Sequence, residues 1–344
     1  MMFSRLKALF PSITGPLGAI ALVLAGGFLL ILGIGGDAVL AYRDLLFANF
    51  DSASNFALFL NRMMPLLLIG LGIVFAFRAG IFNAGAEGQL YLGAMAVTVT
   101  ALEFPNAPGP LLIVLSLAAG IAAGGLWAFI PGLLKLRLGV NEVVTTLMFN
   151  FVALLFTEYL VTNPLRDPAA LGGAMSYTVS KGAWIPEIPG LPGATIGAAI
   201  SVLLAPLAWV ALFRTEWGVN LRATGLNLRF AEAVGIKAER QILTAMLVSG
   251  GLSGLAGAFC VLGLGHRFEQ NFSPGFGLMG MTVALLGGIH PIGVLATAAF
   301  YALILNGAGY MQIDTDVPRS LVGLLTGFLV LLMTVRLRRG REPG

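Results

Sequence analysis

Apolar runs long enough to cross a lipid bilayer recur along the whole chain of 344 residues. A spanning helix needs roughly 20 consecutive, mainly apolar residues, because the hydrocarbon core is about 30 Å thick. Charged residues make up only 10% of the sequence, and hydrophobic residues make up 58%. A soluble globular domain carries about 25% charged residues, so this chain has too little polar surface for a water-facing fold. The sequence therefore predicts an all-α, polytopic membrane protein.

We predict about ten transmembrane helices in a single domain that covers residues 1–344, with both termini cytoplasmic. The eighth helix is short, and a Gly-Gly-Ile-His-Pro break separates it from the ninth. The spans are expected at about 17–36, 56–77, 82–102, 111–134, 143–163, 194–213, 241–264, 276–289, 291–312 and 321–335.

The placement of positive charge predicts the orientation. Cytoplasmic loops carry an excess of Lys and Arg. With the N-terminus inside, most of the 20 basic residues fall in the cytoplasm, and the following remain outside: Arg43, Arg62, Arg166, Lys181, Arg267 and Arg319.

Two long polar loops interrupt the apolar pattern. Residues 214–240 are expected in the cytoplasm, and the proline-rich residues 164–193 are expected on the outer side. The outer loop is either a docking surface for an external binding protein or a plain connector. Both readings remain open from the residues alone.

A short helix is predicted within the cytoplasmic loop, at residues 228–234. Asn227 is a favourable N-cap residue, and Gly235 is a favourable stop. Phe230, Ala231 and Val234 would form its apolar face. Such a helix could lie on lipid or dock in a groove of a soluble partner, and its short length and mixed charge favour the partner.

A first polar motif lies at the cytoplasmic entry to the third span and contains Asn83, Glu87 and Gln89. Asn83 and Glu87 are four residues apart and would share a helical face. A carboxylate is costly in a bilayer, so Glu87 should face the bundle interior or water. The motif could form a wall or hinge of a permeation path, or it could hold a structural ion pair or buried hydrogen bond.

A second motif opens the fifth span, where Glu142, Thr146 and Asn150 are spaced by four residues. This polar stripe should face either a polar path or another helix. The third motif, residues 272–288, has Gly or Pro at both ends of span eight. Irregular backbone at bilayer depth is tolerated where it is buried or lines a cavity. Span eight is thus a candidate path-lining element, with ordinary packing as the alternative.

The sequence offers no catalytic constellation. No GxxxxGK[ST] phosphate loop is present, and the two histidines, His266 and His290, fall in loops on opposite sides. Ser249 and Ser253 lie in a Gly-rich helix, where packing is the expected role. We therefore predict no enzymatic activity, cofactor, metal site or nucleic-acid partner.

Four segments together resemble a known family. They are GLGIVFAFRAGIFNAGAEGQLYLGA (70–94), LKLRLGVNEVVTTLMFN (134–150), WGVNLRATGLNLRFAEAVGI (217–236) and GFGLMGMTVALLGGIHPIG (275–293). The chain resembles permease subunits of ABC importers for simple sugars and nucleosides, within the branched-chain amino acid/ribose permease group. The FNxGxEGQ and GVNEVVxTxMxN forms are most similar to the nucleoside branch. Leu226 and Leu228 depart from the more polar residues expected there.

The resemblance implies a pore subunit of a binding-protein-dependent importer in the bacterial inner membrane. Its expected partners are an ABC ATPase that supplies both nucleotide sites, an extracytoplasmic solute-binding protein, a second permease chain and membrane lipid. The expected substrate is a nucleoside, with a simple sugar of the ribose or galactose type as the alternative. The loop at 222–236 would be the coupling helix.

The residues expected to act fall into two groups. The substrate pathway would involve Asn83, Glu87, Gln89, Glu142, Thr146 and Asn150. Coupling to the ATPase would involve Arg222, Gly225, Asn227, Phe230, Ala231, Glu232 and Gly235. An ATP-independent secondary transporter is less favoured, because paired intramembrane acids would be expected and Glu87 alone is deeply placed. A membrane enzyme would need clustered His, Asp or Ser residues, which the sequence lacks.

Overall fold

The computed structural model describes residues 25–33, 35–170, 173–315, 323 and 327. The chain divides into two compact units, one formed by residues 1–59 and 300–344 and the other by residues 60–299. Residues 17–24 and 34 of the first predicted span, and nearly all of the last, lie outside the described residues.

The first unit contains α2 (Ala38–Phe47), the 3₁₀ turn η1 (Ala48–Phe50), the start of α3 (Ala53–Arg78) and the end of α12 (Pro291–Thr315). Asp37 caps α2, because its side chain accepts hydrogen bonds from the Val39 and Leu40 amides. The core of this unit is a small apolar cluster formed by Ile31, Ala38, Ala41, Leu45, Ile304, Ala308 and Met311.

The second unit holds most of the helices. They are α4 (Ala86–Glu103), α5 (Gly109–Leu138), α6 (Glu142–Thr162), α7 (Ile196–Arg214), α8 (Glu216–Leu226), α9 (Leu228–Ala233), α10 (Ala238–Cys260) and α11 (Phe276–Leu286), with a π-helical turn, η3 (Val261–Gly265), extending α10. Between α6 and α7 lie η2 (Lys181–Ala183) and an antiparallel pair, β1 (Glu187–Ile188) and β2 (Leu191–Thr195). In this pair Glu187 lies opposite Thr195, and Ile188 lies opposite Leu191.

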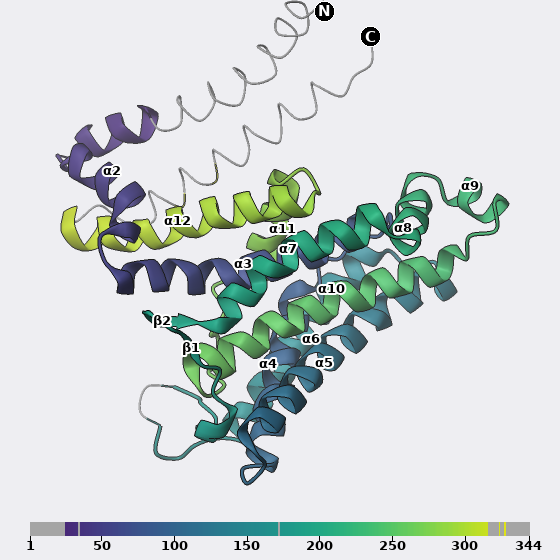
Figure 1. The fold of residues 1–344 in the computed structure, drawn as a ribbon, viewed down its shortest axis with the longest axis horizontal. Coiled ribbons are helices and arrows are strands. Elements are labelled where there is room, and N and C mark those ends of the chain that lie inside the picture. The colour runs from purple at the N-terminus through teal and green to yellow at the C-terminus, as the bar shows by residue number, and fades with distance from the viewer. Residues whose placement is uncertain (1–24, 34, 171–172, 316–322, 324–326, 328–344) are drawn as a thin grey trace, which may run out of the picture. The chain divides into compact units, whose positions relative to one another are not determined.

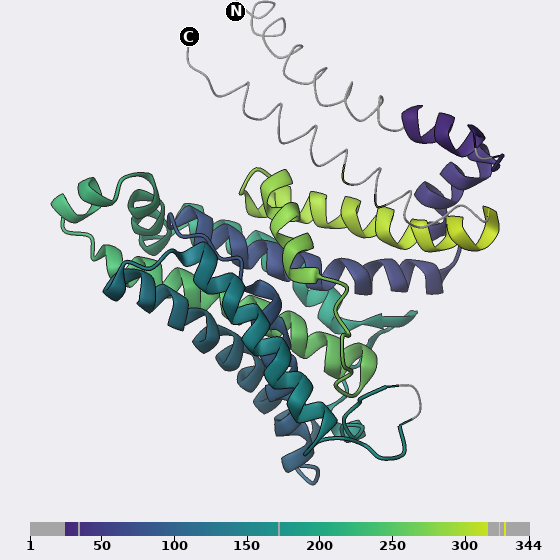
Figure 2. The same cartoon turned by 180° about the vertical axis from the view of Figure 1, so that it is seen from behind.

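Helix α10 forms the centre of the second unit, packed along α5 and α4 (Figures 1 and 2). Glycines allow the close approach. A Cβ atom on Gly124 would lie 2.8 Å from the Gly254 Cα, which is shorter than a tolerable contact. Small residues at such crossings let membrane helices gain dispersion energy from backbone contact, where the hydrophobic effect offers little.

Within the described residues, six helices are long and apolar enough to cross a membrane: α3, α5, α6, α7, α10 with η3, and α12. They correspond to the predicted spans two, four, five, six, seven and nine. The predicted third and eighth spans are the helices α4 and α11, and α11 has only 11 residues. The all-α membrane class is confirmed by these helices.

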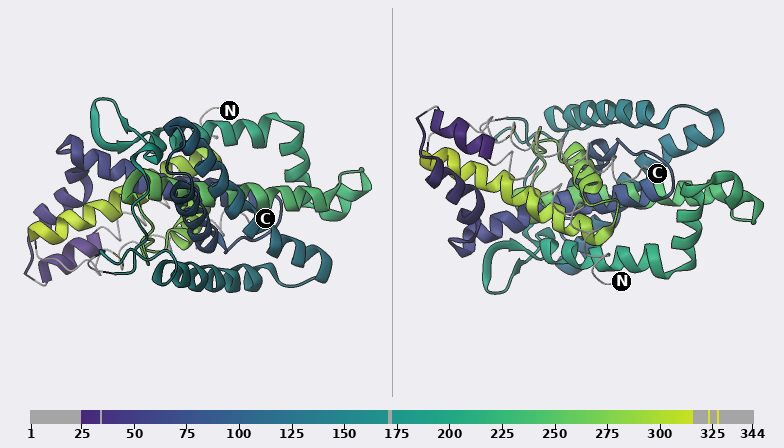
Figure 3. Two further views of the ribbon diagram at one scale, coloured as in Figure 1. Left: turned by 90° about the horizontal axis from the view of Figure 1, so that it is seen from below. Right: turned by 90° about the horizontal axis from the view of Figure 1, so that it is seen from above.

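Helix α9 and the loop around residues 173–180 lie at opposite ends of the second unit (Figures 1 and 3). The loop is held in place by the segment that follows η3. The Ser176 amide donates to the Phe268 carbonyl at 2.9 Å, and the Ile185 amide donates to the Leu262 carbonyl at 2.9 Å. The proline-rich loop is therefore a structured cap over the end of α10.

Candidate functional site

The chain between α3 and α4 is not helical, and yet it is buried. Helix α3 ends at Arg78, and α4 begins at Ala86. Gly80 has a φ of +79°, a left-handed conformation that glycine adopts without steric cost. The Asn83 side chain is completely buried. Buried irregular backbone needs hydrogen-bond partners, and side chains from three helices supply them.

Asn83 is the centre of this hydrogen-bond network. Its Nδ2 donates to Ser249 Oγ at 2.8 Å and to Gln89 Oε1 at 3.1 Å. Its Oδ1 accepts from Gln89 Nε2 at 2.9 Å and from the Gly85 amide at 3.0 Å. The carboxamide thus uses its donors and acceptors within the protein, and it joins α4 to the middle of α10.

Helix α6 holds the other side of the same loop. Thr146 Oγ1 accepts from the Ala84 amide at 3.2 Å. Asn150 makes two hydrogen bonds to this segment. Its Nδ2 donates to the Ala84 carbonyl, and its Oδ1 accepts from the Gly88 amide, both at 2.8 Å. Thr146 and Asn150 are buried. Thr146 and Asn150 of the predicted stripe therefore face the loop before α4 and the first turn of α4.

The loop reaches far along the helix bundle. Ser249 lies eleven positions after Ala238, the first residue of α10. At 1.5 Å per residue, Asn83 meets α10 roughly 16 Å from its start, near the middle of this 23-residue helix.

Glu87 caps a second interrupted helix at this level. Its Oε2 accepts from the Gly277 amide in the first turn of α11, and the Ser273 hydroxyl is a further hydrogen-bond partner. The contact is close, because a Cβ on Gly277 would lie 2.8 Å from the Glu87 Cα. A helix N-terminus favours negative charge, which offsets the cost of the buried carboxylate. Of the structural alternatives for Glu87, the buried hydrogen bond is the one present.

A group of aromatic side chains lies next to Glu87 on the same face of α4. Tyr91 follows one turn later, and its hydroxyl accepts from the Ser273 amide at 3.3 Å. Its ring centroid lies 4.7 Å from that of Phe272 and 6.0 Å from that of Phe268. The non-helical segment before α11 is therefore fixed to α4 by polar and aromatic contacts.

Glu142 lies apart from this network. Its Oε2 pairs with Lys135 Nζ at 2.6 Å, which links the end of α5 to the start of α6. Asn141 caps α6, accepting from the Val143 amide at 2.9 Å. The pair therefore fixes the tight α5–α6 turn.

A second candidate region is formed by α8 and α9, between α7 and α10. The predicted short helix is present as α9, with Asn227 Oδ1 accepting from the Phe230 amide at 3.0 Å. Gly235 has a φ of +87°, as expected for a glycine after a helix end. Ala231 is buried, so it points inward. The exposed apolar surface comes from Leu226, Leu228, Phe230 and Val234.

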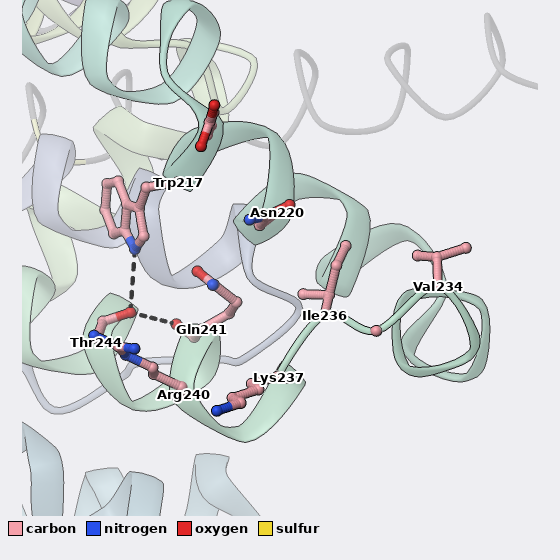
Figure 4. Close-up of a pocket in the computed structure, with 10 residues that line it drawn as sticks. Trp217, Asn220, Val234, Ile236, Lys237, Arg240, Gln241 and Thr244 are labelled. Carbon is pink, nitrogen blue, oxygen red and sulfur yellow. Dashed lines mark hydrogen bonds between the residues drawn. The ribbon is translucent and has the colours of Figure 1, made fainter.

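An open hollow of about 590 Å³ lies beside α9, between α8 and the start of α10 (Figure 4). Lys237 and Arg240 lie on one side of it, and the Trp217 indole N–H donates to the Thr244 hydroxyl at 3.3 Å. This exposed region combines apolar and charged side chains, as a protein-docking surface does.

Helix α8 is anchored to the rest of the unit by Arg222 and Gly225. The Arg222 guanidinium lies 4.7 Å from the Phe213 ring centroid, and its Nε donates to the Leu212 carbonyl at 3.0 Å. A Cβ on Gly225 would lie 2.8 Å from the Gly80 nitrogen. These two residues therefore tie the exposed region to the buried loop after α3.

The structure brings five predicted pathway residues, Asn83, Glu87, Gln89, Thr146 and Asn150, into one region. It leaves Glu142 with its lysine partner. The prediction missed Ser249, which was assigned to packing, and also Tyr91, Ser273 and Gly277. A serine in the middle of an otherwise apolar helix is the signal that could have marked Ser249 as a partner for Asn83.

Buried non-helical connections within a bundle of spanning helices are typical of membrane transport proteins. Residues 55–334 match the family described as branched-chain amino acid transport system / permease component, and the chain belongs to this family.

The curated relatives carry more specific names. The chain is 34% identical to the guanosine ABC transporter permease protein NupP of Bacillus subtilis, covering 92% of both chains. It is 31% identical to the nucleoside ABC transporter permease protein NupB of Lactococcus lactis, over 93% of this chain and 90% of that one. It is 30% identical to a glucose ABC transporter permease protein of Haloferax volcanii, over 92% of this chain and 86% of that one. No solved structure matches.

The protein is thus an ABC transporter permease. Its spanning helices and its relatives make it a multi-pass protein of the bacterial inner membrane.

Proposed function

We propose that this chain is the permease subunit of an ATP-driven, binding-protein-dependent importer of nucleosides. The observation that carries the proposal is similarity over nearly the whole chain to permeases named for guanosine and nucleosides. A simple sugar is the second candidate substrate, because a relative of similar identity is named for glucose.

The proposed topology has ten spans and both termini in the cytoplasm. It places α8 and α9 in the cytoplasm and the loop at 164–193 outside. The opposite positions of α9 and this loop in the second unit support the assignment (Figure 3).

The α8–α9 region is proposed to receive force from the ATPase. A coupling element must make contacts that differ between the nucleotide-bound and nucleotide-free partner. Phe230 and Val234 are 59% and 56% exposed, so they can contact a partner groove without rearrangement. Asn227 and Gly235 define the ends of α9, while Arg222 and Gly225 hold α8 against the body. Arg229 and Glu232 add charges that can select the partner.

The outer cap formed by residues 164–193 is proposed to receive the binding protein. Its backbone bonds to residues 262–270 give the surface a fixed shape, and pre-ordered surfaces lose less entropy on docking. A second permease chain, identical or different, is proposed to complete the pore. Glu87 and the start of α11 lie at the level where the solute would pass, while Asn83, Gln89, Thr146 and Asn150 support that junction.

The test is transport by the reconstituted complex. Proteoliposomes would contain this permease, alone or with a different second permease chain, together with the ATPase and the binding protein. We expect ATP-dependent uptake of radiolabelled guanosine that excess unlabelled nucleoside abolishes and excess ribose or glucose leaves intact. Uptake without ATP would exclude an importer driven by an ATPase. Uptake of glucose with no uptake of guanosine would replace the substrate assignment.

The coupling role has a separate test with a matched pair of variants. Val234→Ala shortens a side chain that is 56% exposed on the proposed docking face, and Val219→Ala shortens one on α8 that is 51% exposed. Truncating an interface anchor costs more than about 1 kcal/mol, whereas most surface changes cost within about 0.5 kcal/mol. We expect Val234→Ala to weaken binding-protein stimulation of ATP hydrolysis more than Val219→Ala does. Equal stimulation in both variants would argue against docking through α9.

A further inference from the structure

A small hollow lies between the outer half of α6, Tyr91 of α4 and the segment after η3. Its volume is about 260 Å³. This is slightly below the roughly 300–1,000 Å³ of sites for drug-sized ligands, so a somewhat smaller molecule would fit. The residues that matter for its chemistry are Tyr91, Phe151, Glu158, Phe268, Gln270 and Asn271.

The backbone that forms one wall of the hollow is not helical. Residues 266–275 leave the end of η3 without forming a helix, and they lead to Gly277, whose amide bonds Glu87. In the proposed topology this segment is the outer connection between the seventh and eighth spans. The hollow therefore lies on the outer side, where a solute released by the binding protein would enter.

The hollow has two chemically different sides. On α6, the Phe151 ring is 59% exposed and Leu155 is 66% exposed, so the apolar side is open to a ligand. The other side carries a carboxylate and two carboxamides. Gln270 Nε2 donates to Glu158 Oε1, which orients both side chains across the rim. Asn271 has a φ of +57°, a left-handed turn conformation that asparagine adopts more readily than most residues.

We propose that this hollow is a transit subsite for a nucleoside, with the base against Phe151 and the ribose hydroxyls against Glu158, Gln270 and Asn271. The inference rests on the proposed function and adds the place where the solute rests. A planar base has an apolar face that stacks on aromatic rings regardless of base identity. Ribose hydroxyls both donate and accept, which matches a carboxylate beside two carboxamides.

The two-sided chemistry disfavours other occupants. A free sugar has a smaller apolar face than a base, so it would cover less of Phe151 and Leu155. An acyl chain of a lipid would cover the Glu158 carboxylate and the Gln270 and Asn271 carboxamides, which is costly because their remaining hydrogen-bonding groups would be desolvated. A nucleoside satisfies both sides at once. The mostly buried Tyr91 and Phe268 offer only part of their rings, so binding should be weak, as release into a pore requires.

The first experiment measures guanosine uptake by the complete transporter in proteoliposomes at saturating binding protein. Phe151→Leu removes the aromatic ring, and Phe156→Leu makes the same change at a side chain of α6 that is 50% exposed and outside the hollow. Stacking on an aromatic side chain is worth enough to lower uptake per ATP hydrolysed by about ten-fold. We expect that loss in Phe151→Leu, with near-normal uptake in Phe156→Leu and normal binding-protein stimulation of ATP hydrolysis in both.

The second experiment locates the solute directly. The transporter would be photolabelled with 8-azidoguanosine, with and without excess guanosine or ribose, and the labelled peptides would be mapped by mass spectrometry. We expect labelling within 151–158 or 268–271 that guanosine suppresses and ribose does not. Labelling confined to other segments, or equal uptake by the two phenylalanine variants, would overturn the subsite.

The outcomes also separate this inference from the proposed function. If the wild-type transporter moves glucose and not guanosine, the proposed substrate fails and the subsite fails with it. If wild-type guanosine uptake is intact and Phe151→Leu matches Phe156→Leu, the subsite alone fails.

Discussion

Asn83 provides the sharpest test of how the buried network contributes to stability. Asn83→Ala removes two bonds to Gln89, one to Ser249 and one to the Gly85 amide. The Gln89 side chain is 1% exposed, so water cannot replace the lost partner without a rearrangement. At least the Gly85 amide and the Gln89 carboxamide would be left unpaired.

The size of the effect follows from these groups. Each buried polar group left without a partner costs about 1–3 kcal/mol, which gives about 2–6 kcal/mol for two groups. Interhelical hydrogen bonds in membrane proteins average about 0.6 kcal/mol, so the bond to Ser249 on α10 is a small part of this total. We therefore expect Asn83→Ala to destabilise the protein by about 2–6 kcal/mol.

Unfolding in mixed micelles of increasing SDS content, followed by circular dichroism, would measure this change. Asn163→Ala is the control, because Asn163 makes its bonds at an exposed helix end and should cost within about 0.5 kcal/mol. A loss below about 1 kcal/mol for Asn83→Ala would refute the reasoning.

The double variant Asn83→Leu with Gln89→Leu separates structure from transport. Replacing both partners with apolar groups of similar shape leaves fewer unpaired groups, so part of the lost stability should return. If guanosine uptake also returns, the two residues act as structural support. If the protein is stable and uptake stays low, one of them contacts the solute.

Three further predictions follow from separate contacts. Gly225→Ala should lower the free energy of unfolding in SDS by about 1–3 kcal/mol, because the new Cβ would lie 2.9 Å from the Ala79 carbonyl carbon. The control Gly309→Ala, at a glycine with open space around it, should leave this free energy unchanged or raise it. Glu87→Gln should lower uptake more than it lowers assembly with the ATPase, since the charge that caps α11 is lost and the shape is kept; wild-type uptake would assign Glu87 a purely structural role. Burial lowers the pKa of the His266 imidazole, which is stacked on Trp184 at 3.7 Å, so its contribution to stability is complete above the unfolded pKa of about 6.5 and is lost as pH falls below it. The midpoint of thermal unfolding should therefore fall with pH below about 6.5 more steeply in the wild type than in His266→Phe, and identical slopes would contradict this.

The elements that the sequence predicts well are those with strong local signals. The long spans follow from unbroken apolar runs, and α9 follows from its cap residue and its glycine. The short length of α11 was also predicted, because Gly and Pro lie at both ends. In each case the residues that determine the structure lie within a few positions of it in the sequence.

The sequence could not predict which polar residues meet across the bundle. The partners Asn83 and Ser249 are 166 positions apart, and Glu87 and Gly277 are 190 apart. Such pairs depend on how the helices cross, and no local pattern encodes a crossing. For the same reason the polar stripe on α6 was ambiguous: a path and a neighbouring loop require the same residue spacing.

The contact between Gly80 and Gly225 has a mechanical consequence for the transporter. Two glycine backbones touch there, with no flexible side chain between them to absorb a displacement. Close-packed interiors transmit small shifts because they have little compressibility. The turn at Gly80 continues into the Asn83 loop, and that loop leads directly to Glu87 and the start of α11. In the proposed coupling scheme, a displacement of α8 by the ATPase would therefore move the junction between α4 and α11 through these backbone contacts.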